Sequence, residues 1–232
     1  MTVFRPQVLE AAAKARADAR ATSFAQLLDQ TAAVPSAERA ELAAGQRPAV
    51  LDPWLRHPVK RALASDIENA SRSAAVDPRL AVAVAVAESS LDPSAKSSDG
   101  LSTGTFQVPE ATEAEIRRKL ASGRLDRPAG HDDVALGVAY LRYLDESFYQ
   151  PTALGRGLET QPVLDSSERR RFATAAFNAG EGRVASAQRR AREGGGDPTR
   201  YADVRPYLPS ITRSYVDRVM RYSGDPGSGG QA

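Results

Sequence analysis

The apolar segment "RLAVAVAVAESSLDP", residues 79–93, constrains the fold of this chain more than any other stretch. Valine alternates with alanine between Leu80 and Ala87, and alternation taken alone suggests a strand. The residues between the valines are alanines rather than polar groups, and Asp77-Pro78 supplies an N-cap followed by a first helical residue. We therefore expect a helix that is buried on all sides and that carries Glu88 at its end.

Helical patterns repeat along the chain, and no strand pattern is found, so the expected fold class is all-α. The expected helices lie within residues 57–76, 77–88, 131–148, 166–180, 181–196 and 208–222. The expected caps are Asp77, Asp132 or Asp133, Ser166 or Ser167, and Ser210. Gly137 lies inside one of these helices, where glycine costs about 1 kcal/mol relative to alanine. A close helix contact at Gly137 would explain its presence.

Composition changes along the chain predict three parts. Residues 1–55 are interpreted as an alanine-rich helical arm and a linker, although a helix packed on the main domain is an equal alternative. Residues 56–222 form the main domain, and the glycine-rich residues 223–232 form a disordered tail. No run of about 18 apolar residues is present to span a membrane. The amino terminus lacks the apolar core of a signal peptide, which leaves a trimmed signal, another export route or an internal location open.

The residue types present exclude several classes of chemistry. The chain has no cysteine, and its two histidines, His57 and His131, lie far apart in the sequence. Disulfides, thiolate metal sites and a cysteine nucleophile are therefore excluded, and a histidine metal cluster or a Ser-His-Asp triad is disfavoured. Carboxylates, hydroxyls and amides remain, and we expect no metal and no cofactor.

Positive charge is concentrated in the last third of the chain. Residues 165–222 contain twelve arginines and seven acidic residues, although the whole chain carries a formal charge of only +2. A solvated helical surface explains this excess, and attraction to an anionic polymer such as the cell wall is the alternative. No nucleic-acid motif accompanies the arginines, so we do not expect a nucleic-acid partner.

Glu88 is the strongest catalytic candidate. On a helix its neighbours are Val84, Ala85 and Leu91, and such apolar surroundings raise the pKa of a carboxyl group. A glutamate that stays protonated near neutral pH can act as a general acid, which the cleavage of a sugar acetal requires. The alternative is an ordinary exposed glutamate just beyond a buried helix.

Four sequence blocks in order resemble the soluble lytic transglycosylases, which are relatives of goose-type lysozyme. The first block, "ESSLDPSAKSSDGLSTGTFQVPEAT", matches their Glu-Ser, Ala-x-Ser, glycine-loop, Gln and Thr pattern through Glu88-Ser89, Ala95-Lys96-Ser97, Gly100, Gly104, Phe106-Gln107 and Thr112. The others are "DDVALGVAYLRYL", "AFNAGEGRV" and "PSITRSYVDRV". The resemblance covers about residues 57–222 and implies a lysozyme-like helical domain.

The resemblance implies a mechanism that depends on one carboxyl group. Glu88 would first protonate the glycosidic oxygen between N-acetylmuramic acid and N-acetylglucosamine. It would then act as a base on the muramic C6 hydroxyl, so that a 1,6-anhydro ring closes without water. Peptidoglycan glycan strands would be the substrate, and the protein would act in the periplasm or cell envelope.

The resemblance also implies a set of substrate-binding residues, namely Ser97, Gly104, Gln107, Phe177, Asn178 and Tyr215. Ser97 and Gln107 would hold the N-acetyl or hydroxyl groups of the sugar, and Gly104, like Gly100, would allow close approach of the loop backbone. Asn178 would present its amide to the cleft. Tyr215 would reach Glu88 and orient it. Without the resemblance, Ser97 is a turn residue, Asn178 a helix-end residue and Tyr215 a core residue.

Three positions depart from the family pattern. The glycine loop "GLSTG" is one residue longer than usual, and Pro109 follows Phe106-Gln107 one place early. Phe177 replaces the usual tyrosine, which keeps the ring but removes a hydroxyl.

Two other functions remain open at this point. A muramidase of the same fold would use water and a second carboxylate, for which Asp92, Asp99 and Glu181 are the candidates. A wall-binding accessory protein is the other alternative, in which residues 1–50 would dock onto a secretion or flagellar apparatus.

Overall fold

The computed structural model describes residues 47–225. Most of the predicted arm, including most of the segment proposed to dock onto an assembly, therefore lies outside the described residues, as do residues 226–232. The remaining part of the expected linker forms the 3-10 helix η1 (Ala49–Leu51) and the helix α3 (Asp52–Leu55). Leu51 is buried, and Trp54 packs edge-on against Tyr222 with the ring centroids 5.3 Å apart. These residues thus belong to the folded domain.

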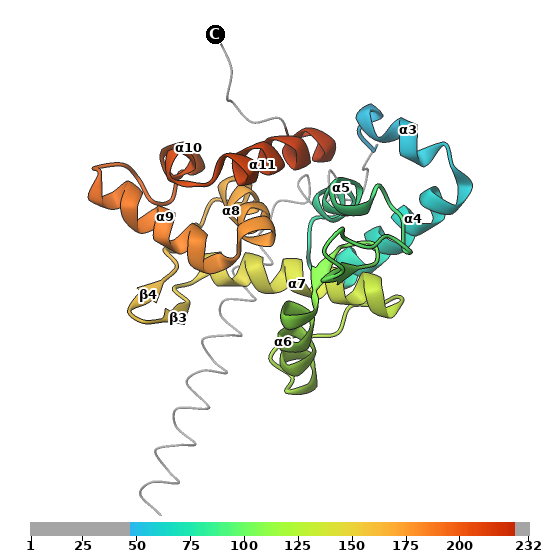
Figure 1. Ribbon diagram of the computed structural model, residues 1–232, viewed down its shortest axis with the longest axis horizontal. Helices are drawn as coiled ribbons and strands as arrows, with labels where there is room; N and C mark the ends of the chain where they lie inside the picture. The colour runs from blue at the N-terminus through green and yellow to red at the C-terminus, as the bar shows by residue number, and fades with distance from the viewer. Residues whose placement is uncertain (1–46, 226–232) are drawn as a thin grey trace, which may run out of the picture. The chain divides into compact units, whose positions relative to one another are not determined.

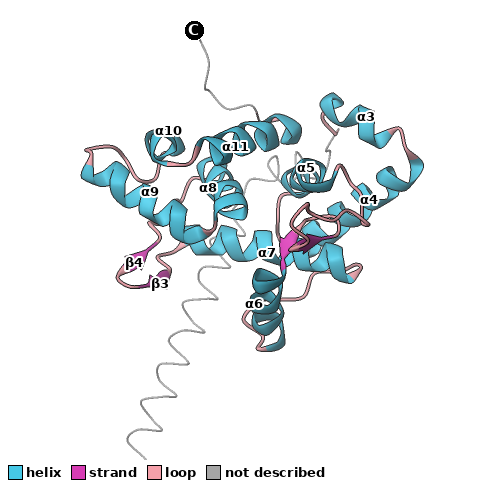
Figure 2. Cartoon of the chain, in the orientation of Figure 1, coloured by secondary structure: helices cyan, strands magenta, loops and turns pink. Residues whose placement is uncertain are grey.

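The described chain is mostly helical, as predicted (Figures 1 and 2). Its longer helices are α4 (Pro58–Ser73), α5 (Pro78–Ser89), α6 (Glu110–Ala121), α7 (Asp132–Tyr149), α8 (Ser166–Ala179), α9 (Glu181–Glu193) and α11 (Ser210–Ser223), with the short α10 (Tyr201–Val204) and η2 (Arg205–Tyr207) between the last two.

Two small antiparallel hairpins were not predicted. One pairs β1 (Ser102–Thr103) with β2 (Val108–Pro109), and the other pairs β3 (Ala153–Gly155) with β4 (Leu158–Glu159). Strands of two or three residues are too short to show an alternating pattern, so the sequence does not predict them.

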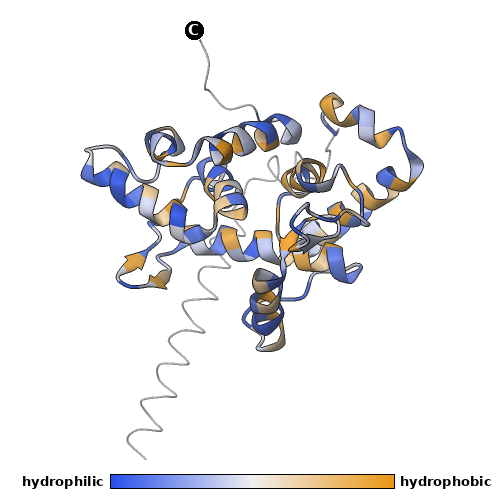
Figure 3. Ribbon diagram, viewed as in Figure 1, coloured by the Kyte–Doolittle hydropathy of each residue, from blue (hydrophilic) through white to orange (hydrophobic). Residues whose placement is uncertain are grey.

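Helix α5 is enclosed by the rest of the domain, as the sequence predicted. Every side chain from Leu80 to Val86 is buried, and α5 packs against α4 and α11. Figure 3 shows the helix as an almost uniformly apolar element. Asp77 caps its start, because its Oδ1 accepts hydrogen bonds from the backbone N–H groups of Arg79 and Leu80 at 2.9 and 3.4 Å.

The other helix caps differ from the prediction. Helix α8 is capped by Asp165, whose Oδ1 accepts a hydrogen bond from the backbone N–H of Glu168 at 2.8 Å. Helices α7 and α11 follow His131 and Pro209, and neither cap makes a side-chain hydrogen bond. The residues predicted as caps, Asp132, Asp133, Ser166, Ser167 and Ser210, lie in the first helical turns instead. Acidic residues also stabilise a first turn through the helix dipole, so the sequence signal did not distinguish these two places.

Gly137 makes the close contact expected of it, but with a loop rather than with another helix. A Cβ atom at this position would lie 2.2 Å from Cγ of Phe106. The Phe106 ring is fully buried, and the chain around it is the glycine loop between α5 and α6. The missing side chain in α7 therefore allows the loop to seat on the helix.

The carboxyl-terminal helix α11 joins the two sides of the domain, because it packs against both α5 and α8 (Figure 1). It extends to Ser223, and Asp225 forms ion pairs with Arg170 and Arg171 at 3.4 and 3.1 Å. The first residues of the predicted disordered tail are thus part of the fold.

Candidate active site

Glu88 lies in the last turn of α5, where the buried helix reaches the surface. Its side chain is half-buried, and the backbone reverses immediately afterwards, with Ser90 and Leu91 both in the left-handed region at φ 57° and 59°. This reversal ends the helix and begins the loop that carries the other candidate residues of the first block. The sequence expectation that a buried helix delivers a carboxyl group to an edge is confirmed.

Tyr215 of α11 donates a hydrogen bond from its hydroxyl to Oε1 of Glu88 at 2.5 Å. The tyrosine is buried, with 4% of its surface exposed, so its ring is fixed by the core while its hydroxyl meets the carboxylate. The contact that the resemblance implied between these two residues is therefore present. It joins residues that are 127 positions apart in the sequence.

The surroundings of Glu88 raise its pKa above the ordinary value of a glutamate. Burial is the main cause, because it removes water from the charged form. The hydrogen bond from Tyr215 and the positive charge of Arg218 act in the opposite direction and lower the pKa. Arg218 also lies over the Tyr215 ring, with its Cζ 5.5 Å from the centroid. The carboxyl group thus holds its proton more tightly, while two groups are ready to stabilise the anion.

One of the two carboxyl oxygens of Glu88 has a hydrogen-bond partner in the part of the chain that the structure describes. Oε1 accepts the bond from Tyr215, and within residues 47–225 no hydrogen bond or ion pair is made to Oε2. A carboxyl group that is held by one oxygen and free at the other is arranged to exchange a proton with a bound molecule.

Ser89 fastens the loop to the end of α5. Its hydroxyl donates to the backbone carbonyl of Thr105 at 2.8 Å and accepts from the backbone N–H of Asp92 at 3.1 Å. The residue next to Glu88 therefore fixes two points of the chain between α5 and α6, at Asp92 and at Thr105, relative to the carboxyl group. Ser89 is part of the Glu-Ser motif, but its place in the sequence did not predict this role.

Gln107 is used by the loop itself. Its Nε2 donates to the carbonyls of Ala95 and Gly104 at 3.1 and 2.8 Å. Its backbone lies in the left-handed region at φ 48°, which is uncommon for a residue other than glycine. The side-chain oxygen Oε1 makes no hydrogen bond to residues 47–225, so the amide retains one acceptor.

Ser97 also has partners inside its own turn. Its hydroxyl donates to Asp99 Oδ1 at 2.6 Å and accepts from the backbone N–H of Ser102 at 3.0 Å. These bonds close the turn that contains Gly100, whose φ is 71°. The structure thus gives Ser97 the turn role that the sequence analysis considered, and its contact with a sugar stays a prediction.

Gly104 makes a close approach to α7. A Cβ atom there would lie 2.5 Å from Oδ1 of Asp133, and φ is 83°. Asp133 Oδ2 accepts a hydrogen bond from the backbone N–H of Thr105 at 2.8 Å. The loop therefore rests on the first turn of α7 through a carboxylate that the sequence analysis interpreted only as a possible cap.

The end of α8 approaches the same region through α11. Asn178 is exposed, and its Oδ1 accepts a hydrogen bond from the hydroxyl of Thr212 at 2.9 Å. Thr212 and Tyr215 are three residues apart on α11, and residues at this spacing are neighbours on one helix face. Helix α11 thus brings Asn178 to the side on which Tyr215 holds Glu88. The amide nitrogen of Asn178 makes no hydrogen bond within residues 47–225.

Phe177 is half-buried beside the core. Its ring lies 5.0 Å from that of Tyr140 with an interplanar angle of 41°. Compared with the usual tyrosine of the family, Phe177 therefore lacks a hydroxyl group at a position where its ring packs against that of Tyr140. The structure assigns Phe177 a packing role and leaves its contact with a sugar as a prediction.

The candidates for a second catalytic carboxylate do not resemble Glu88. Asp92 and Asp99 are exposed, and hydrogen bonds from the Ser94 and Ser97 hydroxyls are the main cause that lowers the pKa of each. Glu181 accepts a hydrogen bond from the Tyr143 hydroxyl at 3.2 Å. Within residues 47–225, no group of three or more metal-ligating side chains is arranged to hold a metal ion, and no helix is long and apolar enough to cross a membrane.

Comparison with known proteins identifies relatives of this chain. It is 30% identical over 159 residues to a membrane-bound lytic murein transglycosylase F of Desulfosudis oleivorans, covering 68% of this chain and 31% of that protein. It is 29% identical over 147 residues to the protein of the same name from Aeromonas salmonicida, covering 63% and 26%. The chain therefore spans about a third or less of the length of these relatives.

A solved structure, the 70 kDa soluble lytic transglycosylase of Escherichia coli, aligns with 70% of this chain and 24% of that protein at 21% identity and a TM-score of 0.49. The model of the transglycosylase SLT domain family matches residues 65–198, more than half of the chain. That segment contains Glu88, the glycine loop and the end of α8. The chain therefore belongs to the transglycosylase SLT domain family.

Proposed function

We propose that this protein is a peptidoglycan lytic transglycosylase in which Glu88 acts alone as general acid and then as general base. The observation that carries the proposal is the environment of Glu88. Its carboxyl group has a raised pKa, one oxygen is held by Tyr215, and the other is without a partner in the described chain. Membership of the SLT domain family supports the same reaction.

The first step transfers the proton of Glu88 to the glycosidic oxygen between N-acetylmuramic acid and N-acetylglucosamine. The bond from muramic C1 to that oxygen breaks, and N-acetylglucosamine leaves with a hydroxyl group. Glu88 is then a carboxylate, which the hydroxyl of Tyr215 and the charge of Arg218 stabilise. These contacts act on the charge that develops in the transition state, where electrostatic stabilisation is most effective.

The second step returns the proton to the enzyme. The Glu88 carboxylate takes the proton of the muramic C6 hydroxyl, and the C6 oxygen bonds to C1. The product is a 1,6-anhydro ring, no water is consumed, and Glu88 is protonated again for the next cycle. One carboxyl group that changes its protonation state twice is therefore sufficient.

The surrounding polar groups supply contacts to the sugar in this proposal. The amide nitrogen of Asn178 offers a donor and Oε1 of Gln107 offers an acceptor, since neither atom makes a hydrogen bond within residues 47–225. Gly100 leaves its backbone open to a ligand, because a Cβ there would meet no atom of the described chain within 4 Å. The missing side chain of Gly104 faces Asp133, so Gly104 would contact the sugar only through its backbone, and the Phe177 ring offers an apolar surface. Ser97 acts mainly by holding the loop that carries these groups.

The hydrolytic alternative is less well supported. An inverting muramidase requires a second carboxylate as a base for water, about 6.5–9.5 Å from the acid. Asp92 and Asp99 have lowered pKa values and are held in exposed turns, which makes them weak bases. Glu181 accepts the Tyr143 hydroxyl, and no hydrogen bond within residues 47–225 links it to Glu88 or to Tyr215.

The proposed substrate places the protein in the periplasm or cell envelope, where peptidoglycan is found. The proposed docking of residues 1–50 onto a secretion or flagellar assembly stays a prediction. A truncation of residues 1–46, which keeps Arg47 and η1 in the folded domain, is expected to change localisation without loss of cleavage.

The test is the substitution Glu88→Gln combined with product analysis. Glutamine keeps the side-chain volume but cannot donate a carboxyl proton, so glycan cleavage should fall by at least 10²-fold while circular dichroism shows a retained fold. Mass spectrometry of the wild-type products should show anhydro ends, which are lighter by one water than reducing ends. Wild-type activity in the variant would refute the role of Glu88, and dominant reducing ends would favour the muramidase.

A further inference from the structure

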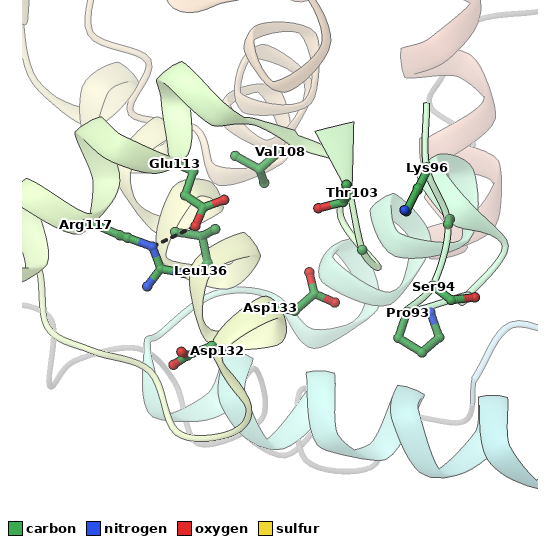
Figure 4. Close-up of a pocket in the computed structure, with 12 residues that line it drawn as sticks. Pro93, Ser94, Lys96, Thr103, Val108, Glu113, Arg117, Asp132, Asp133 and Leu136 are labelled. Carbon is green, nitrogen blue, oxygen red and sulfur yellow. Dashed lines mark hydrogen bonds and ion pairs between the residues drawn. The ribbon is translucent and has the colours of Figure 1, made fainter. Parts of the chain in front are cut away.

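A second polar site lies on the outer side of the glycine loop. A cavity of about 430 Å³ opens between residues 93–96, the β1–β2 hairpin, α6 and the first turn of α7 (Figure 4). Glu88 is not among the residues that line it. The cavity is therefore distinct from the catalytic carboxyl group, although it shares Gly104 with the residues that are proposed to contact the sugar.

Some charged side chains of the cavity form ion pairs and others do not. Arg117 is paired with Glu113 at 2.7 Å, and Asp132 is paired with Arg127. Lys96, by contrast, makes no ion pair within residues 47–225, and its side chain is exposed. Among the described residues that line the cavity, Lys96 is therefore a cation that can bind a ligand.

Asp133 provides a free acceptor at the same cavity. Its Oδ2 accepts the backbone N–H of Thr105, but its Oδ1 has no hydrogen-bond or ion-pair partner in the described chain. Figure 4 shows the Asp133 carboxylate and the Lys96 ammonium turned into the opening from different walls. A cation and an anion on separate walls match a ligand that carries both charges.

The cavity and the catalytic site share the loop between them. Ala95 and Gly104 line the cavity, and their carbonyls accept the amide of Gln107. The next residue, Thr105, is bound by Ser89, the neighbour of Glu88. To reach the cavity, a peptide attached to a sugar near Glu88 must cross this loop, and three extended residues span about 10 Å.

We propose that this cavity binds the peptide stem of peptidoglycan, at a diamino acid whose ammonium pairs with Asp133 and whose carboxylate pairs with Lys96. The inference rests on the proposed function, because the stem is attached to the muramic acid that Glu88 would cleave. Peptide stems of this kind carry both charges close together, as the two walls of the cavity require. The site thus makes the enzyme prefer strands that carry their stems over strands that have lost them.

The test compares kcat/KM on two substrates, glycan strands with their stems and strands from which an amidase has removed them. Wild type should prefer the stem-bearing strands by roughly three- to tenfold, the range of a few partly exposed charged contacts. Lys96→Glu should remove this preference and leave the rate on bare strands unchanged. The control Arg156→Glu makes the same charge reversal at an exposed residue in the β3–β4 hairpin and should keep the preference.

A chemical change in the substrate tests the Asp133 side of the site. Acetylation of the free stem amine removes the positive charge and should abolish the preference of wild type, while the carboxylate remains. Equal wild-type values of kcat/KM on both kinds of strand would refute the stem site. A decrease of kcat/KM in Lys96→Glu that is the same for both kinds of strand would also refute it. Cleavage of bare strands with anhydro products would in either case keep the proposed function, so the two failures are distinguishable.

Discussion

The hydrogen bond from Tyr215 to Glu88 should control the pH dependence of the enzyme. Tyr215→Phe removes only the hydroxyl that donates to Oε1 at 2.5 Å and keeps the buried ring. Hydrogen bonds to charged groups contribute about 1.5–3 kcal/mol. This bond favours the ionised form of Glu88 and so lowers its pKa, in opposition to burial. Its loss should therefore raise the pKa further and change the ionisation equilibrium by a factor of about ten or more.

The consequence for activity has two parts. Glu88 must be protonated before the reaction begins, so kcat/KM falls as the pH rises through the pKa of Glu88 in the free enzyme. In Tyr215→Phe this fall should move to higher pH. The maximum rate should drop about tenfold or more, because the carboxylate formed in the first step loses its stabilising partner.

The assay is the pH profile of kcat/KM on purified glycan strands for wild type and variant. Tyr222→Phe is the matched control, since it removes a tyrosine hydroxyl from the same helix, and that hydroxyl makes no hydrogen bond within residues 47–225. Its profile should equal that of wild type. A profile for Tyr215→Phe that stays in place, or moves to lower pH, would show that Tyr215 does not stabilise the ionised form.

Two further predictions concern stability. Gly137→Ala should destabilise the fold by about 1–3 kcal/mol in urea denaturation, because overpacking against Phe106 outweighs the helix-propensity gain of about 1 kcal/mol. The control is Gly182→Ala in α9, where a Cβ meets no described atom within 4 Å, and this variant should not be destabilised. Equal effects of the two substitutions would contradict the packing argument. Glu88→Gln should flatten the pH dependence of stability. The pKa of Glu88 is raised in the folded state, so its contribution to the free energy of unfolding is fully present below the unfolded-state pKa near 4.5 and is lost as the pH rises through the folded-state pKa. Towards neutral pH the variant should therefore become more stable relative to wild type. Parallel curves of stability against pH would refute this.

Much of the fold was predictable because its signals are local. The cap at Asp77 and the apolar residues that follow it predict α5 and its burial, and both are confirmed. The apolar spacing of the segment after His131 likewise predicts α7, whose residues Val134 and Leu144 are buried. Cap positions were less predictable, since the same polar residues favour the cap and the first turn.

The sequence by itself determined that a buried helix ends in a carboxyl group, that cysteine chemistry is unavailable, and that a histidine metal cluster or a Ser-His-Asp triad is disfavoured. Capping residues and apolar patterns are local signals between neighbours along the chain, and the residue types present are read directly from the sequence. Only the tertiary structure decided which partners those residues have. The Tyr215 hydroxyl reaches Glu88 across 127 residues, Phe106 fills the space that Gly137 leaves, and Gln107 turns its amide inward to hold its own loop. Hydrogen bonds and packing act over a few ångströms in space, and only the folded chain brings such distant residues within that range.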